Sequence, residues 1–451
     1  MMCRSPRRPR TIRRFERIAR SGIDDGKEEG PGLAKLTIEG RIPLNGAVSI
    51  NGSKNSALAL ISAAMLAREG RVIFENVAPG SDVQDLCEIV MAVGGDVRWL
   101  DRTTLELWCA PLEGHAAPYH LARKLRASTY VVGALLARVG EADVAFPGGC
   151  QIGSRPVDFH IRGFQALGAD MSLEHGSIRG RVHRRLKGTR IYIERASVGT
   201  TVNMMIAGAL AEGTTILENA AMEPEIVDLA TFLNAMGGHV RGAGTNLVRI
   251  DGVERLHGVR HEVIPDRIEA ATYLMAAATT RGSVEVRDVI PEHFRTVLLK
   301  LEQAGGEIEE HADRVRVTFP QRAKAVDIET LPHPGFPTDL HPPMVALLTL
   351  ADGVAVVQET VFDNRFAYTH ELARMGASIK VDRDTAIVRG VEQLTGSPVE
   401  AQDLRGGVAL VLAGLGAEAE TEINGVEHVD RGYVGLAEKL QALGGHVTRR
   451  E

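Results

Sequence analysis

Residues 94–97 read Gly94-Gly95-Asp96-Val97, and this stretch decides the fold because related copies of it recur along the whole chain. Each copy is a Gly-Gly or Gly-Ala pair followed by a polar and then an apolar residue, and successive copies lie 68 to 74 residues apart. Glycine at such a place predicts a helix that ends in the left-handed conformation, followed by a short strand. The other copies are Gly168-Ala169-Asp170-Met171, Gly237-Gly238-His239-Val240, Gly305-Gly306-Glu307-Ile308, Gly376-Ala377-Ser378-Ile379 and Gly444-Gly445-His446-Val447.

Ala-rich apolar segments recur at the same interval. Each continues for about a dozen mostly apolar residues, as in residues 57–66 and 408–416. A helix that is apolar nearly all round is a buried helix. One unit therefore reads as strands, a buried helix, a strand, a loop, a second helix and a strand. The segments start near Lys54, Arg126, Ser197, Asp266, Pro337 and Asp403.

A period of about 70 residues separates this pattern from helical solenoids, whose repeats are about 20–50 residues long. Longer units with a fully buried helix indicate closed, pseudo-symmetric domains. We therefore expect an α/β fold of six pseudo-repeats, three in each of two domains, with a boundary near residues 263–265. The strands expected within residues 36–51 precede the first buried helix, and we expect them to close onto the last unit.

Composition describes an ordinary globular protein of 451 residues, with 44% hydrophobic and 24% charged residues. The net charge is −6, but residues 1–20 hold eight arginines against Glu16 alone, so the rest of the chain is more acidic still. An acidic body argues against nucleic acid as a partner. No apolar run reaches the length of a membrane span, so we expect no membrane association. We expect residues 1–34 to be a disordered basic extension, and a transit peptide is the alternative.

The four cysteines are Cys3, Cys87, Cys109 and Cys150. They are too few and too unpatterned for a disulfide framework, which indicates a reducing compartment such as the cytoplasm. No Cys or His spacing is typical of a metal site, and we expect neither metal nor cofactor.

The loop at residues 147–158 combines a thiol with a guanidinium group. Three glycines among seven residues indicate a turn, with Cys150 at its centre and Arg155 five residues later. A nearby cation favours the reactive thiolate and suits a phosphate or carboxylate ligand. The alternative is a glycine turn with an inert cysteine.

Cations also stand at the starts of the expected buried helices, at Lys54, Arg126, Arg267 and Arg405. Capping accounts for acidic residues at helix starts, such as Asp266 and Asp403. Capping does not account for the cations, because the helix dipole disfavours positive charge there. A second repeating position, the loop after each unit's next strand, holds Asp82, Cys150, residues 223–225, His293, residues 364–365 and residues 430–433. Together these positions predict a multiply anionic substrate held between two domains, close to one thiol.

Eight motifs in order resemble the UDP-N-acetylglucosamine 1-carboxyvinyltransferase family, from about Leu36 to the C-terminus. The motifs are Gly52-Ser53-Lys54-Asn55-Ser56-Ala57, Leu125-Arg126-Ala127-Ser128, the stretch from Pro147-Gly148-Gly149-Cys150 to Asp158, Ser197-Val198-Gly199, Pro265-Asp266-Arg267-Ile268-Glu269, Phe336-Pro337-Thr338-Asp339, Asp403-Leu404-Arg405 and Asp430-Arg431-Gly432-Tyr433.

This resemblance implies a fold, a reaction and two substrates. The fold is a two-domain inside-out α/β barrel, with a first domain at 54–264 and a second made of 35–53 plus 265–451. The reaction transfers the enolpyruvyl group of phosphoenolpyruvate to the 3′-hydroxyl of UDP-N-acetylglucosamine and releases phosphate, as the first committed step of peptidoglycan synthesis. The sequence departs from the family pattern in its first 34 residues and at Arg195, where lysine is common.

The resemblance also implies roles for single residues. Cys150 is the proton donor to phosphoenolpyruvate, forms an adduct with it and is the target of the epoxide fosfomycin. Asp339 faces the sugar hydroxyl as a candidate general base. The residues implied to bind substrate at the reacting centre are Lys54, Asn55, Arg126, Arg155, Arg405 and Arg431, and those implied to contact the uridine nucleotide are Arg155, Pro156, Val157, Asp158, Phe159, Arg195, Ala196, Ser197, Val198 and Val361.

Two other interpretations stay open. The sibling enolpyruvyl transferase that acts on shikimate 3-phosphate shares the fold, but its class lacks the Gly-Gly-Cys loop. A non-catalytic paralogue could bind the UDP-sugar as a sensor, although an intact Cys150, Asp339 and arginine set argues against it.

Overall fold

The computed structural model describes residues 34–146 and 157–450. Each apolar segment singled out in the sequence forms a helix that begins within four residues of the expected start, so these predictions are confirmed. The helix α8 is buried along its whole length. The buried helices are α1 (Lys54–Ala64), α4 (Ser128–Arg138), α6 (Val198–Ala209), α8 (Arg267–Thr280), α10 (His341–Thr349) and α12 (Leu404–Gly416).

A second set of helices precedes the recurring glycine pairs. The first glycine of every pair has a positive φ, from 90° at Gly168, Gly376 and Gly444 to 104° at Gly94, which confirms the predicted left-handed helix ends. These helices are α2 (Ser81–Ala92), α5 (Asp158–Ala166), α7 (Pro224–Ala235), α9 (Arg295–Gln303), α11 (Thr369–Arg374) and α14 (Leu436–Ala442). Shorter helical turns are α3 (Tyr119–Ala122), α13 (Glu427–Asp430), η2 (Pro291–Phe294) and η3 (Thr338–Leu340).

The strands form short sheets of similar topology, in which one edge strand is parallel to its neighbour and the remaining pairs are antiparallel. In strand order they are β15 (Arg260–Glu262), β4 (Val72–Glu75), β6 (Leu105–Trp108) and β5 (Asp96–Trp99); β10 (Arg190–Tyr192), β11 (Thr214–Glu218), β13 (Leu247–Asp251) and β12 (His239–Arg241); β17 (Glu307–Glu310), β18 (Arg314–Thr318), β16 (Ser283–Arg287) and β2 (Asn45–Ser49); β19 (Ile328–Glu329), β20 (Val354–Gln358), β22 (Thr385–Arg389) and β21 (Ser378–Asp382); and β23 (Pro398–Glu400), β24 (Glu420–Asn424), β1 (Lys35–Glu39) and β25 (His446–Arg450).

One sheet has three strands, β7 (Glu141–Ala145), β9 (Ser177–Arg181) and β8 (Asp170–Glu174). A single parallel bridge from Ala116 to Asp143 stands where the other sheets have a parallel edge strand. Two further short strands, β14 (Leu256–His257) and β3 (Ala67–Glu69), pair with each other.

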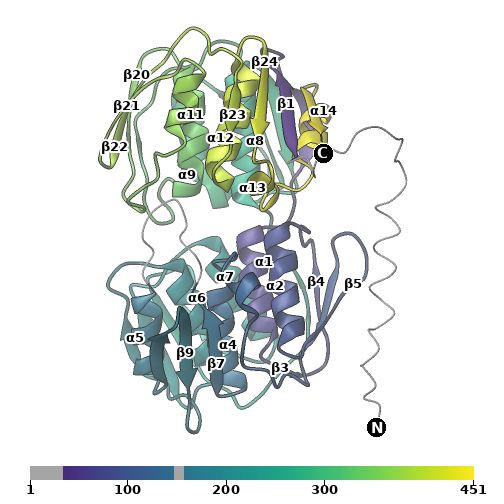
Figure 1. Ribbon diagram of the computed structural model, residues 1–451, viewed down its shortest axis with the longest axis vertical. Coiled ribbons are helices and arrows are strands. Elements are labelled where there is room, and N and C mark those ends of the chain that lie inside the picture. Colours follow the sequence, from purple (N-terminus) through teal and green to yellow (C-terminus); the bar gives the residue numbers. More distant parts are fainter. Residues whose placement is uncertain (1–33, 147–156, 451) are drawn as a thin grey trace, which may run out of the picture. The chain divides into compact units, whose positions relative to one another are not determined.

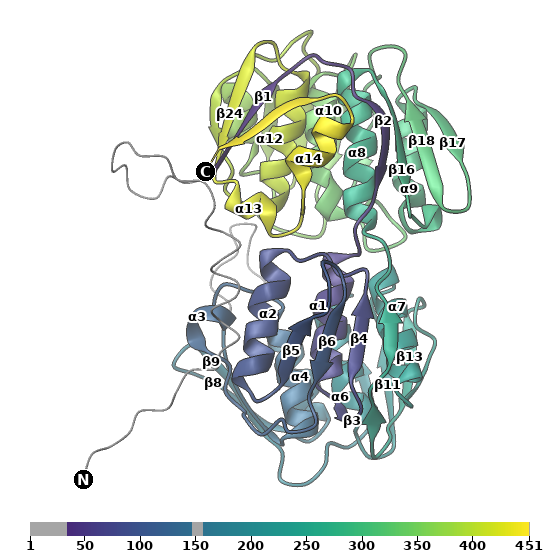
Figure 2. The same cartoon turned by 90° about the vertical axis from the view of Figure 1, so that its right-hand side faces the viewer.

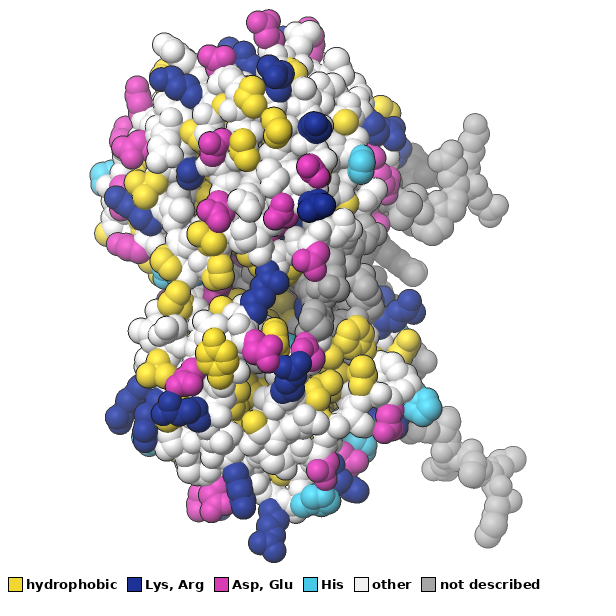
Figure 3. Space-filling view, turned by 90° about the vertical axis from the view of Figure 1, so that its left-hand side faces the viewer, with side chains coloured by type: hydrophobic (Ala, Val, Ile, Leu, Met, Phe, Trp, Pro, Cys, Tyr) yellow, Lys and Arg dark blue, Asp and Glu magenta, His cyan; other side chains and the backbone are white. Residues whose placement is uncertain are grey.

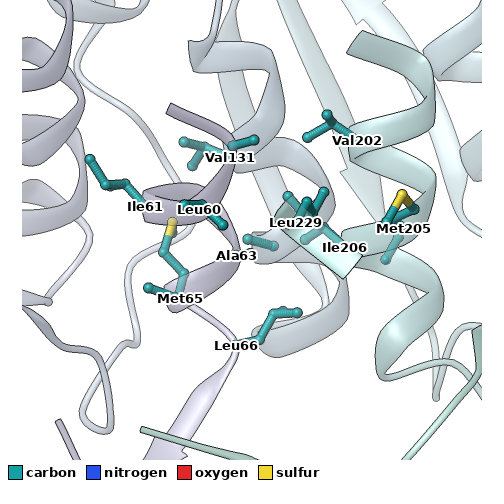
Figure 4. Close-up of a cluster of buried hydrophobic side chains, with 14 of the residues drawn as sticks. Leu60, Ile61, Ala63, Met65, Leu66, Val131, Val202, Met205, Ile206 and Leu229 are labelled. Carbon is teal, nitrogen blue, oxygen red and sulfur yellow. The ribbon is translucent and has the colours of Figure 1, made fainter. Parts of the chain in front are cut away.

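The buried side chains form two clusters, which we name the first core and the second core. The first core is built from residues between 57 and 263, and the second from residues 36–50 and 268–447. In the first core, α1 contacts α4, α6 and α7, and Figure 4 shows Ala63, Ile206 and Leu229 of three of these helices close together. In the second core, α10 and α12 pack on each other and on α8 (Figure 1).

The first two strands of the described chain belong to sheets of the second core. Strand β1 lies between β24 and β25, and β2 pairs with β16, as Figure 2 shows. The chain leaves the second core at residues 51–53 and returns at residues 264–266. These two connections run side by side, since Asp266 N donates to Asn51 O at 2.9 Å and Ser53 N donates to Ile264 O at 2.7 Å. A Cβ at Gly52 would lie 1.6 Å from the Asn76 carbonyl oxygen, so only glycine fits between them.

A buried carboxylate at the outgoing connection gives the fold a pH dependence. Glu269 of α8 is 2% exposed and accepts from the Asn51 amide at 2.9 Å and from Lys439 Nζ at 2.8 Å. Burial raises the pKa of Glu269 from 4.5 to about 6, against the opposing effect of Lys439. The folded protein therefore holds this proton in a pH range where the unfolded chain has released it.

We expect this group to lower stability as the pH rises from about 4.5 to 6, because the folded state binds more protons than the unfolded state there. The loss should be about 2 kcal/mol. Urea denaturation of wild type and Glu269→Gln at pH 4.5 and 6.5 measures it, and the variant should show a smaller decrease. Equal decreases in both proteins would contradict the assignment.

Charges on the described surface are mixed. On the face in Figure 3, Lys and Arg side chains alternate with Asp and Glu. In the part of the chain that the structure describes, no helix is both long and apolar enough to span a bilayer.

Candidate active site

Two cations implied to bind phosphoenolpyruvate converge on one carboxylate. Lys54 is the first residue of α1, and its Nζ lies 3.0 Å from Oδ2 of Asp82. Arg431 comes from the segment after α13, and its Nε donates to Oδ1 of Asp82 at 2.8 Å. Burial opposes ionisation of Asp82, but Lys54 and Arg431 outweigh it and hold the pKa of Asp82 below its ordinary value. Residues that are 377 positions apart in sequence thus meet within hydrogen-bond distance of one side chain.

Asp339, the candidate base, is held by two arginines. It lies in the turn η3 immediately before α10, and its Oδ2 accepts from Nε and Nη2 of Arg405 at 3.2 and 3.0 Å. Its Oδ1 accepts from Nη2 of Arg365 at 3.3 Å. The side chain of Asp339 is 28% exposed whereas those of Arg405 and Arg365 are 5% and 2% exposed, so the carboxylate is the part of this group that a substrate can reach.

Arg405 itself is fixed from behind. Burial lowers its pKa, but the Asp339 carboxylate outweighs burial and raises the pKa of Arg405 above the ordinary value. Its guanidinium lies 5.4 Å from the ring centre of Tyr433, and the Tyr433 hydroxyl lies 2.9 Å from Thr272 Oγ1. Asp403 caps α12 by accepting from the amides of Arg405 and Gly406, which confirms its expected capping role.

The structure brings together two of the residues implied to contact the nucleotide. Nη2 of Arg195 donates to the carbonyl oxygens of Thr360 and Val361 at 2.5 and 2.8 Å. Ser197 caps α6 by accepting from the Thr200 amide at 3.3 Å. Ala196 lies between these two residues and Val198 is the first residue of α6.

The remaining described candidates occupy other helix starts. Val157 is buried, Asp158 accepts from Arg162 at 3.1 Å, and the Phe159 ring lies 5.9 Å from the Arg162 guanidinium. Asn55 is a half-buried residue in the first turn of α1. The carbonyl of Arg126 accepts from the Thr129 amide at 3.2 Å at the start of α4.

Cys150, Arg155 and Pro156 lie outside the described residues. Two other cysteines are described, and both are buried. Burial raises the pKa of Cys87 and of Cys109 to about 12, so their thiols are inert at neutral pH.

One cation has a protein partner that the sequence did not reveal. Arg267 was expected to indicate an anionic ligand, but its Nε and Nη2 lie 3.2 and 3.4 Å from the carboxylate of Glu225, and both residues are buried. That interpretation is therefore wrong for Arg267, because the ion pair accounts for the charge. Asp266 caps α8, as expected.

Asp82 and Arg365 join the site although the sequence assigned them no role in it. Both fall at the repeating loop position, which was the available signal. In the described ranges, no group of three or more His, Cys, Asp or Glu side chains is placed to hold a metal ion.

Comparison with solved structures defines the class of protein. The chain resembles the enolpyruvyl transferase NikO of Streptomyces tendae, with a TM-score of 0.83, 25% identity and coverage of 93% of this chain and 99% of that one. The fold also matches EPSP synthase of Acinetobacter baumannii, with a TM-score of 0.72, 18% identity and coverage of 93% and 100%. The architecture is thus an α/β enolpyruvyl transferase fold.

Sequence comparison gives the family. Residues 38–440 match the EPSP synthase (3-phosphoshikimate 1-carboxyvinyltransferase) family. UDP-N-acetylglucosamine 1-carboxyvinyltransferase 2 of Symbiobacterium thermophilum is 60% identical over 92% of this chain and 98% of its own length. UDP-N-acetylglucosamine 1-carboxyvinyltransferase 1 of Caldanaerobacter subterraneus subsp. tengcongensis is 49% identical over 92% and 99%. The chain therefore belongs to the EPSP synthase family, among its UDP-N-acetylglucosamine 1-carboxyvinyltransferases, and is an enzyme of the transferase class.

Proposed function

We propose that this enzyme transfers the enolpyruvyl group of phosphoenolpyruvate to the 3′-hydroxyl of UDP-N-acetylglucosamine, with release of phosphate, in the cytoplasm and as the first committed step of peptidoglycan synthesis. The observation that carries the proposal is the convergence of Lys54 and Arg431 on Asp82, which gives a substrate with several negative charges two preorganised cations. The names of the similar transferases support the same reaction. In this proposal the two cores belong to two domains, 54–264 and 35–53 plus 265–451, of an inside-out α/β barrel.

The cations have the task of holding phosphoenolpyruvate. Lys54, Arg155 and Arg431 bind its phosphate and carboxylate, with Arg126 and Arg405 nearby. Asp82 keeps Lys54 and Arg431 oriented, and cations that are already oriented cost no reorganisation as charge develops. Asn55 holds substrate at the reacting centre.

The chemical steps are an addition followed by an elimination. Cys150 donates a proton to C3 of phosphoenolpyruvate, and positive charge develops at C2. The sugar hydroxyl attacks C2 while Asp339 accepts its proton. C3 then loses a proton to a base, the double bond re-forms and the phosphate leaves. Contacts to the uridine nucleotide come from residues 155–159, residues 195–198 and Val361.

Phosphate release measures this function directly. We expect phosphate from phosphoenolpyruvate plus UDP-N-acetylglucosamine, and background release with shikimate 3-phosphate as acceptor, because Arg195 and Val361 are assigned to a nucleotide. Release with shikimate 3-phosphate alone would favour the sibling activity. Binding of the UDP-sugar without any turnover would favour the sensor.

A further inference from the structure

The turn that carries Asp339 is tied to a buried carboxylate outside the cation cluster. Glu359 follows β20 and is 2% exposed. Its Oε2 accepts from the Thr338 hydroxyl at 2.8 Å, and Thr338 is the residue before Asp339. The backbone oxygen of Thr338 accepts from Arg365 at 3.3 Å, so both sides of Thr338 are held.

The other oxygen of Glu359 holds the segment that meets Arg195. Oε1 accepts from the amides of Val361 and Phe362 at 2.8 and 3.0 Å. The Val361 carbonyl is one of the two acceptors of Arg195. One carboxylate therefore joins the proposed nucleotide contact to the turn that carries the proposed base.

A second connection runs in parallel with the first. The Arg365 guanidinium lies 5.7 Å from the ring centre of Phe362, and the same guanidinium donates to Asp339. Residues 359–365 thus contact the Asp339 turn twice, once through Glu359 and once through Arg365.

Glu359 has a rigid surrounding. Oε2 lies 3.1 Å from Nδ1 of His341, while Nε2 of His341 lies 3.2 Å from the Tyr368 hydroxyl. A neutral His341 with its hydrogen on Nδ1 can satisfy both neighbours. Burial opposes ionisation of the Glu359 carboxyl, but His341 and the hydrogen bonds outweigh burial and hold its pKa at about 2. The group is therefore a charged acceptor throughout the working pH range.

We propose that Glu359 is a positioning residue, which couples the nucleotide contact at Val361 to the orientation of Asp339 through Thr338. This inference rests on the proposed function. It assigns Glu359 no contact with substrate, so substitution should lower kcat more than it weakens substrate binding.

The test uses two positions at the ends of one hydrogen bond. In Glu359→Gln, the single carbonyl oxygen can stay on the two backbone amides, and the charged acceptor for Thr338 is then lost. Thr338→Val removes the donor with similar volume, and Thr338→Ser keeps it. We expect kcat to fall about 10-fold or more in Glu359→Gln and Thr338→Val. We expect Thr338→Ser to stay close to wild type.

Binding and coupling separate this role from a merely structural one. Calorimetric Kd values for UDP-N-acetylglucosamine should stay within about threefold of wild type, because the Val361 side is kept. The double variant should be no slower than the slower single variant, since both changes break the same link. Glu329→Gln, an exposed carboxylate on the same sheet, is the matched control and should leave kcat unchanged.

Three results would overturn the inference: kcat values within threefold of wild type in both single variants, multiplied losses in the double variant, or an equal loss in Thr338→Ser and Thr338→Val. If Glu359→Gln fails to fold, the Thr338→Ser and Thr338→Val comparison decides alone. A wild-type enzyme that releases no phosphate contradicts the proposed function and this inference with it. An active wild type with unaffected variants contradicts this inference only.

Discussion

Replacing Asp339 with asparagine should lower kcat by about 10²–10⁴-fold, because the amide cannot accept a proton from the sugar hydroxyl. Asparagine has the same size and can still accept from Arg405 or Arg365 through its carbonyl oxygen, so the turn η3 should keep its place. The expected pattern is a large loss of kcat with a small change in KM for UDP-N-acetylglucosamine, measured by steady-state phosphate release.

The control for this variant is Asp382→Asn, which changes an exposed carboxylate at the end of β21. It should have wild-type kinetics. An Asp339→Asn enzyme with more than a tenth of wild-type kcat would remove Asp339 from the role of general base, while leaving its ion pairs in place.

Fosfomycin should inactivate the enzyme completely and modify one cysteine, Cys150. The reagent is an anionic phosphonate with an epoxide, and the cations assigned to phosphoenolpyruvate should bind it next to that thiol. Cys87 and Cys109 should stay unmodified, because burial raises the pKa of each to about 12 and keeps both thiols away from solvent. Mass spectrometry of peptides should find one adduct, on the peptide that contains Gly149-Cys150-Gln151, in proportion to lost activity.

Cys150→Asp is the informative variant for this experiment. A carboxyl group keeps a proton donor but is a poorer nucleophile than a thiolate, so the variant should retain turnover and resist the epoxide. An active wild type that is indifferent to fosfomycin would show that Cys150 is not the reactive thiol.

Sequence reasoning located the buried helices and the glycine helix ends because both depend on local signals. An apolar run of about a dozen residues and a glycine at its end specify a buried helix and its termination without knowledge of the partner. The same is true of the caps Asp266 and Asp403, which bind amides two or three residues away.

The parts of the site that could not be predicted are the pairings between distant residues. Nothing near Lys54 or Arg431 shows that both face Asp82, and nothing near Arg267 shows that Glu225 neutralises it. Glu359 was missed for the same reason, because its neighbours Thr338 and His341 lie on the turn and helix that precede β20. A charge at a helix start indicates that some counter-charge exists, but only the tertiary structure tells whether it is a ligand or a side chain.

The pairing of β1 and β2 has a consequence for synthesis on the ribosome. Val48 pairs with Val286, and Ile38 pairs with Thr421 and Val447, so the earliest strands wait for partners made much later. The first core is continuous in sequence and can form while the nascent chain is still growing. Residues 35–49 must meanwhile keep unpaired strand edges until the last strand, β25, leaves the exit tunnel. A chain that stalls before residue 446 therefore has one assembled core and exposed β-strands, which is the kind of species that chaperones bind and proteases remove.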